Sequence, residues 1–122
     1  LTGLMLKASQ MGVPRVSFRE MYFLEYSRKI RQAVKVPLGY LGGASSLDNA
    51  REAMAEGFDA VVMARPLIHD SQLVNRFQRG EITRSGCTHC NRCVPYIYHP
   101  AGTWCVMNPP NDKALNRQPA SA

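Results

Sequence analysis

The sequence has no cysteine before position 87 and no long apolar run. Its apolar runs are short, such as residues 60–64, whereas a membrane helix needs roughly 20 apolar residues. The chain starts at Leu1, with neither Met nor a signal-peptide pattern, so we expect a fragment or a processed product. Its 122 residues, 45% of them hydrophobic, fit one folded domain or part of a larger one and argue against wholesale disorder.

Acidic residues are also scarce. Nine Asp and Glu stand against fifteen Lys and Arg, which gives a net charge of +6. The densest basic patch, Arg28, Lys29, Arg31 and Lys35, lacks the interleaved aromatics or reader motif of a nucleic-acid surface. We therefore predict a solvated helix face and no nucleic-acid partner, with one or two arginines left for an anionic ligand.

Apolar runs alternate with helical patterns in the first 80 residues. A helix is predicted to start at Ser17, which has capping-box spacing to Glu20, and to run to about residue 34 with Phe23, Tyr26 and Ile30 on its apolar face. Two strands at 36–41 and 58–64 flank a helix at 46–56, and a further helix is expected at about 71–79. The unbroken apolarity of the strands favours a parallel sheet covered on both faces, and hence an α/β fold.

Two loops following these strands carry the residues of a candidate phosphate site. Gly42 and Gly43 stand between a strand and a capped helix, where backbone amides approach an anion closely; the alternative is a tight turn that only needs positive φ. Ala64 and Arg65 follow the second strand, and the guanidinium of Arg65 can bind phosphate with two hydrogen bonds. In a β/α barrel, the loops after two late strands commonly build one phosphate site, although a surface ion pair is the alternative role for Arg65.

All four cysteines lie within 19 residues and follow a metal-ligand spacing. The pattern is Cys87-x2-Cys90-x2-Cys93-x11-Cys105. Three thiols this close favour a [4Fe–4S] cluster over zinc, whose ribbons use separated knuckles. Zinc, with His89 or His99 as a substitute ligand, and no metal at all are the alternatives. Clustered cysteines also indicate a reducing compartment, and we expect a cytoplasmic protein.

Three segments together resemble one enzyme family. They are residues 41–45, residues 57–68 and residues 87–93, in this order. The combination is similar to the last part of the Old Yellow Enzyme-like NADH:flavin oxidoreductases. Within that family, it resembles the iron–sulfur branch that includes 2,4-dienoyl-CoA reductase and trimethylamine dehydrogenase. The resemblance covers about residues 36–108.

The resemblance implies the C-terminal fragment of a (β/α)8 TIM barrel. Residues 1–85 would supply strands seven and eight of the FMN-binding barrel, residues 86–110 the four-cysteine segment, and residues 111–122 a tail or interdomain linker. Gly42, Gly43, Ala64 and Arg65 match the family's FMN phosphate site, although many members have Gly where this chain has Ala64. The cluster ligands match the four cysteines.

The implied function is an FMN-dependent oxidoreductase of the ene-reductase type, with NAD(P)H as electron donor and a small-molecule substrate. The chain would need the rest of the barrel, and would pass electrons towards a further C-terminal redox domain; alone it is expected to be inactive. Its oligomeric state stays open. No catalytic residue is assigned, since the family's lie in earlier strands; His69, Tyr96 and Tyr98 are better explained by surface and packing roles. The alternatives are a zinc-stapled module without redox role and an unrelated phosphate-binding barrel.

Overall fold

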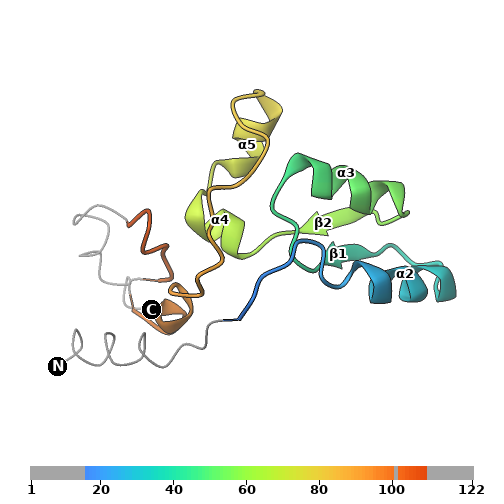
Figure 1. Ribbon diagram of the computed structural model, residues 1–122, viewed down its shortest axis with the longest axis horizontal. Helices are drawn as coiled ribbons and strands as arrows, with labels where there is room; N and C mark the ends of the chain where they lie inside the picture. The colour runs from blue at the N-terminus through green and yellow to red at the C-terminus, as the bar shows by residue number, and fades with distance from the viewer. Residues whose placement is uncertain (1–15, 101, 110–122) are drawn as a thin grey trace, which may run out of the picture. The chain divides into compact units, whose positions relative to one another are not determined.

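The computed structural model describes residues 16–100 and 102–109 (Figure 1). The predicted tail at 111–122 lies outside the described residues. The chain divides into two compact units, one of which is Ser17–Cys87, while the other includes the described residues from Thr88 onward. The boundary falls between Cys87 and Thr88, close to the boundary expected at residue 86, but it leaves the first cysteine with the α/β unit.

The Ser17–Cys87 unit is built around two parallel strands joined by a helix. Strand β1 (Gly39–Leu41) pairs with β2 (Ala60–Val62), and helix α3 (Leu47–Ala55) lies between them in sequence. Adjacent parallel strands with a connecting helix are as the sequence predicts, although both strands are shorter than expected. Closure into a barrel stays a prediction.

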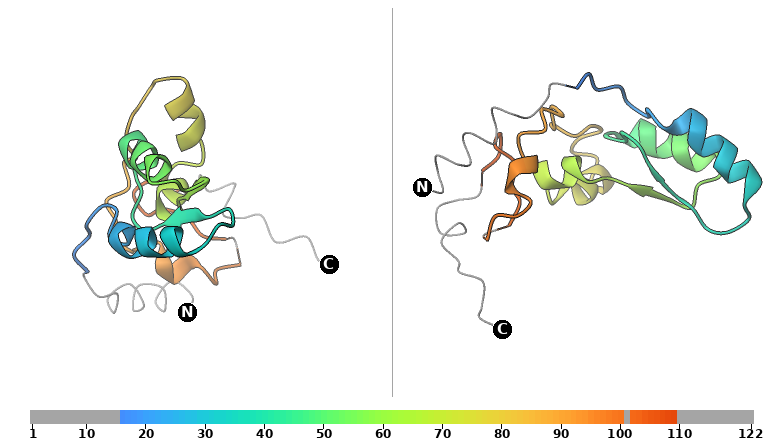
Figure 2. Two further views of the ribbon diagram at one scale, coloured as in Figure 1. Left: turned by 90° about the vertical axis from the view of Figure 1, so that its right-hand side faces the viewer. Right: turned by 90° about the horizontal axis from the view of Figure 1, so that it is seen from below.

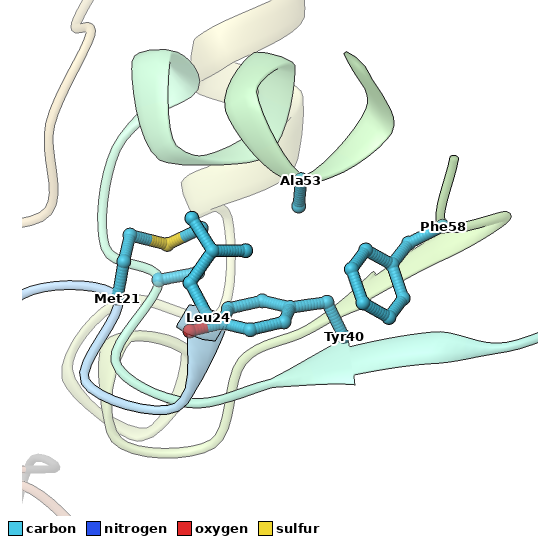
Figure 3. Packing of buried hydrophobic residues seen from close by; sticks show 6 residues of the cluster. Met21, Leu24, Tyr40, Ala53 and Phe58 are labelled. Atoms are coloured by element: carbon cyan, nitrogen blue, oxygen red, sulfur yellow. The ribbon is translucent and has the colours of Figure 1, made fainter. Parts of the chain in front are cut away.

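The core lies on one face of this sheet. Figure 3 shows Tyr40 and Phe58 of the sheet region pointing towards Met21 and Leu24, with Ala53 of α3 above them. Tyr40 is 1% and Ala53 0% exposed. Figure 2, in its right-hand view, shows helices α2 (Leu24–Ala33) and α3 on the same side of the strands.

The other face of the sheet is open among the described residues. Because side chains alternate along a strand, Leu41 and Val62 point away from Tyr40 and Val61, and they are 56% and 45% exposed. The expectation of a sheet covered on both faces is therefore wrong for the described part of the chain.

Helix α2 begins six residues later than the capping-box spacing predicts, with its N-cap at Phe23 and not at Ser17. Phe23 makes no side-chain cap, and Glu20 instead accepts from Ser45, which precedes α3, and from Asn49 of α3. The predicted apolar face is also wrong: Tyr26 is 62% and Ile30 56% exposed. The physical reason is that the two arginines of α2 form ion pairs with the segment after α3. Arg28 pairs with Glu56, and Arg31 pairs with Asp59.

After β2, the chain forms two short helices where the sequence predicts one. Helix α4 (Arg65–His69) precedes α5 (Leu73–Gln78). Pro66 lies in the first turn of α4, where a missing N–H removes no helical bond. From Thr88 onward, the only regular element in the described residues is the 3-10 turn η1 (Val94–Tyr96). Across the described ranges, no helix combines the length and apolarity needed to cross a membrane.

Candidate functional site

The four predicted phosphate-site residues lie at one edge of the sheet. Leu41 is opposite Val62 in the parallel register, so the segments that follow the two strands leave from the same edge. Gly42 and Gly43 follow β1 directly, and Ala64 and Arg65 begin two residues after β2. The strand pairing thus brings the two loops together, while phosphate binding stays a prediction.

The turn at Gly42 and Gly43 has room for no side chain. A Cβ on Gly42 would lie 2.7 Å from the Tyr40 hydroxyl oxygen, and that hydroxyl donates to the Gly42 carbonyl at 2.7 Å. Gly43 has φ +86°, and its Cβ would lie 2.7 Å from a ring carbon of Tyr22. The simpler interpretation, a turn that needs positive φ, is therefore correct for Gly43, and it is compatible with anion binding.

Arg65 is the first residue of α4 and is half-buried. Its guanidinium carbon lies 5.7 Å from the ring centroid of Phe18, within the range of a cation–π contact. This contact orients the guanidinium and, because the ring carries no formal charge, does not neutralise it. A charged guanidinium and a glycine turn on two loops at the same edge of a sheet are an arrangement that suits an oxyanion.

Aromatic side chains that the sequence interpretation did not assign to the site link its two loops. The ring of Tyr22 packs on Gly43 and lies edge-to-face on Phe18, with centroids 6.3 Å apart. Phe18 in turn lies under Arg65. The signal that could have identified them is the cluster of aromatics just before α2, which the helix prediction placed inside the helix.

The first turn of α3 offers fewer amide donors than the sequence suggests. The Ser45 N–H donates to Asn49 Oδ1 at 2.9 Å, and the Leu47 N–H donates to the Thr83 carbonyl at 2.9 Å. The Asn49 N–H donates to the N-cap Ser46 Oγ at 3.2 Å. The N–H groups of Ser45, Leu47 and Asn49 are thus satisfied by the protein itself, and the predicted anion site is left to the glycine turn and Arg65.

The first predicted metal ligand, Cys87, is fixed to the α/β unit. Its N–H donates to Ser85 Oγ at 3.1 Å, and the Ser85 N–H donates to the Ser45 carbonyl at 2.8 Å. The segment at 83–85 therefore connects the start of α3 to the start of the cysteine segment. A Cβ on Gly86 would lie 2.7 Å from His69 Nε2, so this histidine packs against the same connection.

The loop from Thr88 to Cys93 combines an unusual backbone with a stabilised thiolate. His89 and Asn91 have φ +55° and +59°, a conformation that turns successive amides inward in anion-binding nests. Partial burial raises the pKa of the exposed Cys90, but the Arg92 backbone, the Thr88 hydroxyl and the Arg92 charge outweigh it. The net pKa of Cys90 lies below its ordinary value, which favours the thiolate form that metals bind.

Cys105 is buried and lies in a short antiparallel bridge to Asn108. The neighbouring Trp104 packs on Tyr96, with centroids 4.0 Å apart, and on His99, with centroids 4.8 Å apart. These contacts agree with a packing role for Tyr96. Tyr98 is 94% exposed.

Within residues 16–100 and 102–109, no group of three or more His, Cys, Asp or Glu side chains is arranged to hold a metal ion. Cys87 belongs to one unit, and Cys90, Cys93 and Cys105 belong to the other. The metal centre therefore stays a prediction that rests on cysteine spacing and thiol chemistry.

Two curated reductases are similar to this chain. One is a 4,4'-dithiodibutanoate disulfide reductase from Rhodococcus erythropolis, 46% identical over 94 residues, which cover 77% of this chain and 23% of the relative. The other is a bilirubin reductase from Mediterraneibacter gnavus (strain CC55_001C), 28% identical over 109 residues, which cover 86% of this chain and 17% of the relative. The chain thus spans less than a quarter of the length of these relatives. No family model and no solved structure matches it.

Proposed function

We propose that this chain is the part of an FMN-dependent oxidoreductase of the Old Yellow Enzyme type that binds the phosphate of FMN. The observation that carries the proposal is the placement of the glycine turn and Arg65 at one edge of a parallel sheet. The similarity to two proteins named as reductases supports an oxidoreductase role. The two strands would then be the last two strands of a (β/α)8 barrel, and Leu41 and Val62 would face its interior.

The residues of the glycine turn fit a phosphate group. The Gly43 backbone is held at positive φ against the Tyr22 ring, and Arg65 contributes a positive charge from the loop after the neighbouring strand. The chemistry supplied by bound FMN is hydride transfer from a reduced nicotinamide to a small organic acceptor. In this chain, Gly42 and Gly43 would hold the phosphate through amides, and Arg65 would neutralise its charge.

The four cysteines fit a [4Fe–4S] cluster by the chemistry of the donor set. Four thiols are available, and the lowered pKa of Cys90 favours a thiolate at neutral pH. The left-handed backbone at His89 and Asn91 is compatible with amides directed at an anionic cluster. Cys87, Cys90, Cys93 and Cys105 would be the ligands, and Thr88 and Arg92 would stabilise the ligand at Cys90.

The FMN proposal is tested by Arg65→Ala in the whole protein that contains this chain. Loss of a charge-assisted hydrogen bond should weaken FMN binding by about 1.5–3 kcal/mol. The measurement is the dissociation constant of FMN after dialysis, by flavin fluorescence. Arg51→Ala is the matched control, since Arg51 lies on exposed α3 surface and pairs only with the exposed Asp48 among the described residues. Equal FMN affinity in both variants would show that Arg65 does not meet the phosphate.

The alternative function, a zinc-stapled module, predicts a different metal content in the purified protein. A purified sample with iron, acid-labile sulfide and broad brown absorbance supports the cluster. A colourless sample with zinc supports the structural module. If the same sample contains bound sugar phosphate and no FMN, the chain belongs to an unrelated phosphate-binding barrel.

A further inference from the structure

A polar cluster anchors the chain immediately after the glycine turn. It consists of Glu20, Ser45, Asn49 and Arg84, and we call it the Glu20 cluster. Oε1 of Glu20 accepts from Ser45 Oγ at 3.1 Å and from Arg84 Nη1, while Oε2 accepts from Asn49 Nδ2 at 3.1 Å. One carboxylate thus joins three segments that are far apart in sequence.

Ser45 is held by each of its polar groups. Its hydroxyl donates to Glu20, its N–H donates to Asn49 Oδ1, and its carbonyl accepts from the Ser85 N–H. It is 3% exposed and stands two residues after Gly43. On the other side of the turn, the Tyr40 hydroxyl holds the Gly42 carbonyl. The turn is therefore held on both sides, by the Tyr40 hydroxyl before it and by the Glu20 cluster after it.

The charge balance of the cluster suits a neighbouring anion. A lone carboxylate near the turn would repel a phosphate, but Arg84 pairs with Glu20 and offsets its charge. The Arg84 segment also runs antiparallel to the start of α3 through a bridge with Ser46, so the guanidinium has a fixed approach to the carboxylate. The cluster orders the turn without presenting net negative charge to it.

We propose that Glu20 is a positioning residue that presets the Gly42–Gly43 turn for a flavin phosphate. This inference rests on the proposed FMN function and adds a residue outside both phosphate-site loops. A preset turn binds its ligand without losing backbone freedom on binding, so its contribution appears as affinity. Because only the phosphate meets the turn, the contribution belongs to FMN and not to riboflavin, which lacks the phosphate.

The test is Glu20→Gln in the whole protein, with dissociation constants measured for FMN and for riboflavin. The new amide NH2 must face a donor, either Asn49 Nδ2 or Arg84, so the cluster loses a hydrogen bond to a charged group. We expect the FMN dissociation constant to rise about tenfold and the riboflavin constant to stay within about twofold. Glu25→Gln is the matched control: it removes the same charge from an exposed position in the first turn of α2 and should leave both constants unchanged.

Each outcome decides the matter. An unchanged FMN constant in Glu20→Gln overturns the inference, and so does an equal loss of FMN and riboflavin affinity, since that would mark a merely structural role. If Glu20→Gln does not fold, Ser45→Ala removes a single donor to the carboxylate and should weaken FMN binding selectively; failure to do so also overturns it. A wild-type protein with equal affinity for FMN and riboflavin would instead refute the phosphate site of the proposed function itself.

Discussion

At the scale of single residues, Gly43 combines two constraints that substitutions can separate. Gly43→Ala forces a left-handed Ala and also places a methyl group 2.7 Å from the Tyr22 ring. Gly80 has φ +70° with nothing within 4 Å of its would-be Cβ, so Gly80→Ala measures the backbone cost alone. We expect about 1–2 kcal/mol of destabilisation for Gly80→Ala and about 2–4 kcal/mol for Gly43→Ala by urea unfolding. Equal losses would show that the Tyr22 ring moves aside freely.

The thiol of Cys90 gives a pH-dependent prediction. Its pKa is lowered, so the thiolate persists to lower pH than in an ordinary cysteine, and Thr88 contributes one of the hydrogen bonds responsible. In the metal-free protein, Thr88→Val should therefore move the midpoint of Cys90 alkylation to higher pH. The readout is the alkylated fraction of the Cys90 peptide by mass spectrometry across pH.

The control for this prediction is Thr103→Val. Its hydroxyl donates to the Tyr96 carbonyl and takes no part in lowering the Cys90 pKa. Both variants lose one hydroxyl and gain one methyl, so a shift common to both would contradict a specific role for Thr88.

The position of the two loops at one edge of the sheet could be predicted, because each loop follows an apolar run that indicates a parallel strand. The roles of Phe18 and Tyr22 could not. Their contacts with Arg65 and Gly43 join loops after two different strands, and nothing local in the sequence distinguishes such aromatics from helix residues.

At the scale of elements, the N-terminus of α3 depends on its cap. Ser46 is 2% exposed, and its Oγ accepts from the Asn49 N–H. Ser46→Ala should cost about 1 kcal/mol of unfolding free energy, measured by urea titration. Ser71→Ala is the control, because Ser71 is exposed and precedes α5, whose N-cap makes no side-chain bond. A loss no larger than in the control would mean that the Thr83 segment holds the helix start by itself.

Elements were predictable where their signals are local. The cap of α3 and the two apolar runs lie within a few residues of the structure that they specify. The start of α2 was not predictable, because Glu20 has capping-box spacing to Ser17 but bonds Ser45 and Asn49, which lie 25 and 29 residues away. Likewise, the apolar stripe of α2 was assigned inward, while the ion pairs of Arg28 and Arg31 orient the helix the other way.

At the scale of the whole molecule, the two units should respond differently to removal of metal. The Ser17–Cys87 unit has its own apolar core, whereas the described residues from Thr88 to Pro109 contain one short 3-10 turn. If these residues hold the proposed metal centre, their order depends on it. We expect chelation to raise amide hydrogen exchange strongly in residues 88–109 and little in residues 39–62.

Single cysteine substitutions provide the matched test. Cys87→Ser, Cys90→Ser, Cys93→Ser and Cys105→Ser should each lower iron and sulfide per chain, and each should raise exchange in residues 88–109. A variant that keeps full metal content identifies a cysteine outside the ligand set. Uniform loss of protection across both segments would contradict the independence of the two units.

For physical reasons, this sequence alone does not determine barrel closure or the geometry of the metal centre. A barrel is defined by closure between its first and last strands, and the described residues contain one strand pair. A metal centre is defined by where thiols converge, and cysteine spacing limits that geometry without determining it.

The sequence separation of the Glu20 cluster has a consequence for the order of folding. Strands β1 and β2 pair positions 21 residues apart, as in Gly39 with Ala60, and α3 forms between them. The contact between Glu20 and Arg84 closes a loop of 64 residues. Closing a longer loop costs more entropy, so the strand–helix–strand segment should form first and the Glu20 contacts later. The glycine turn would therefore become rigid last in folding, after the sheet that carries it is already in place.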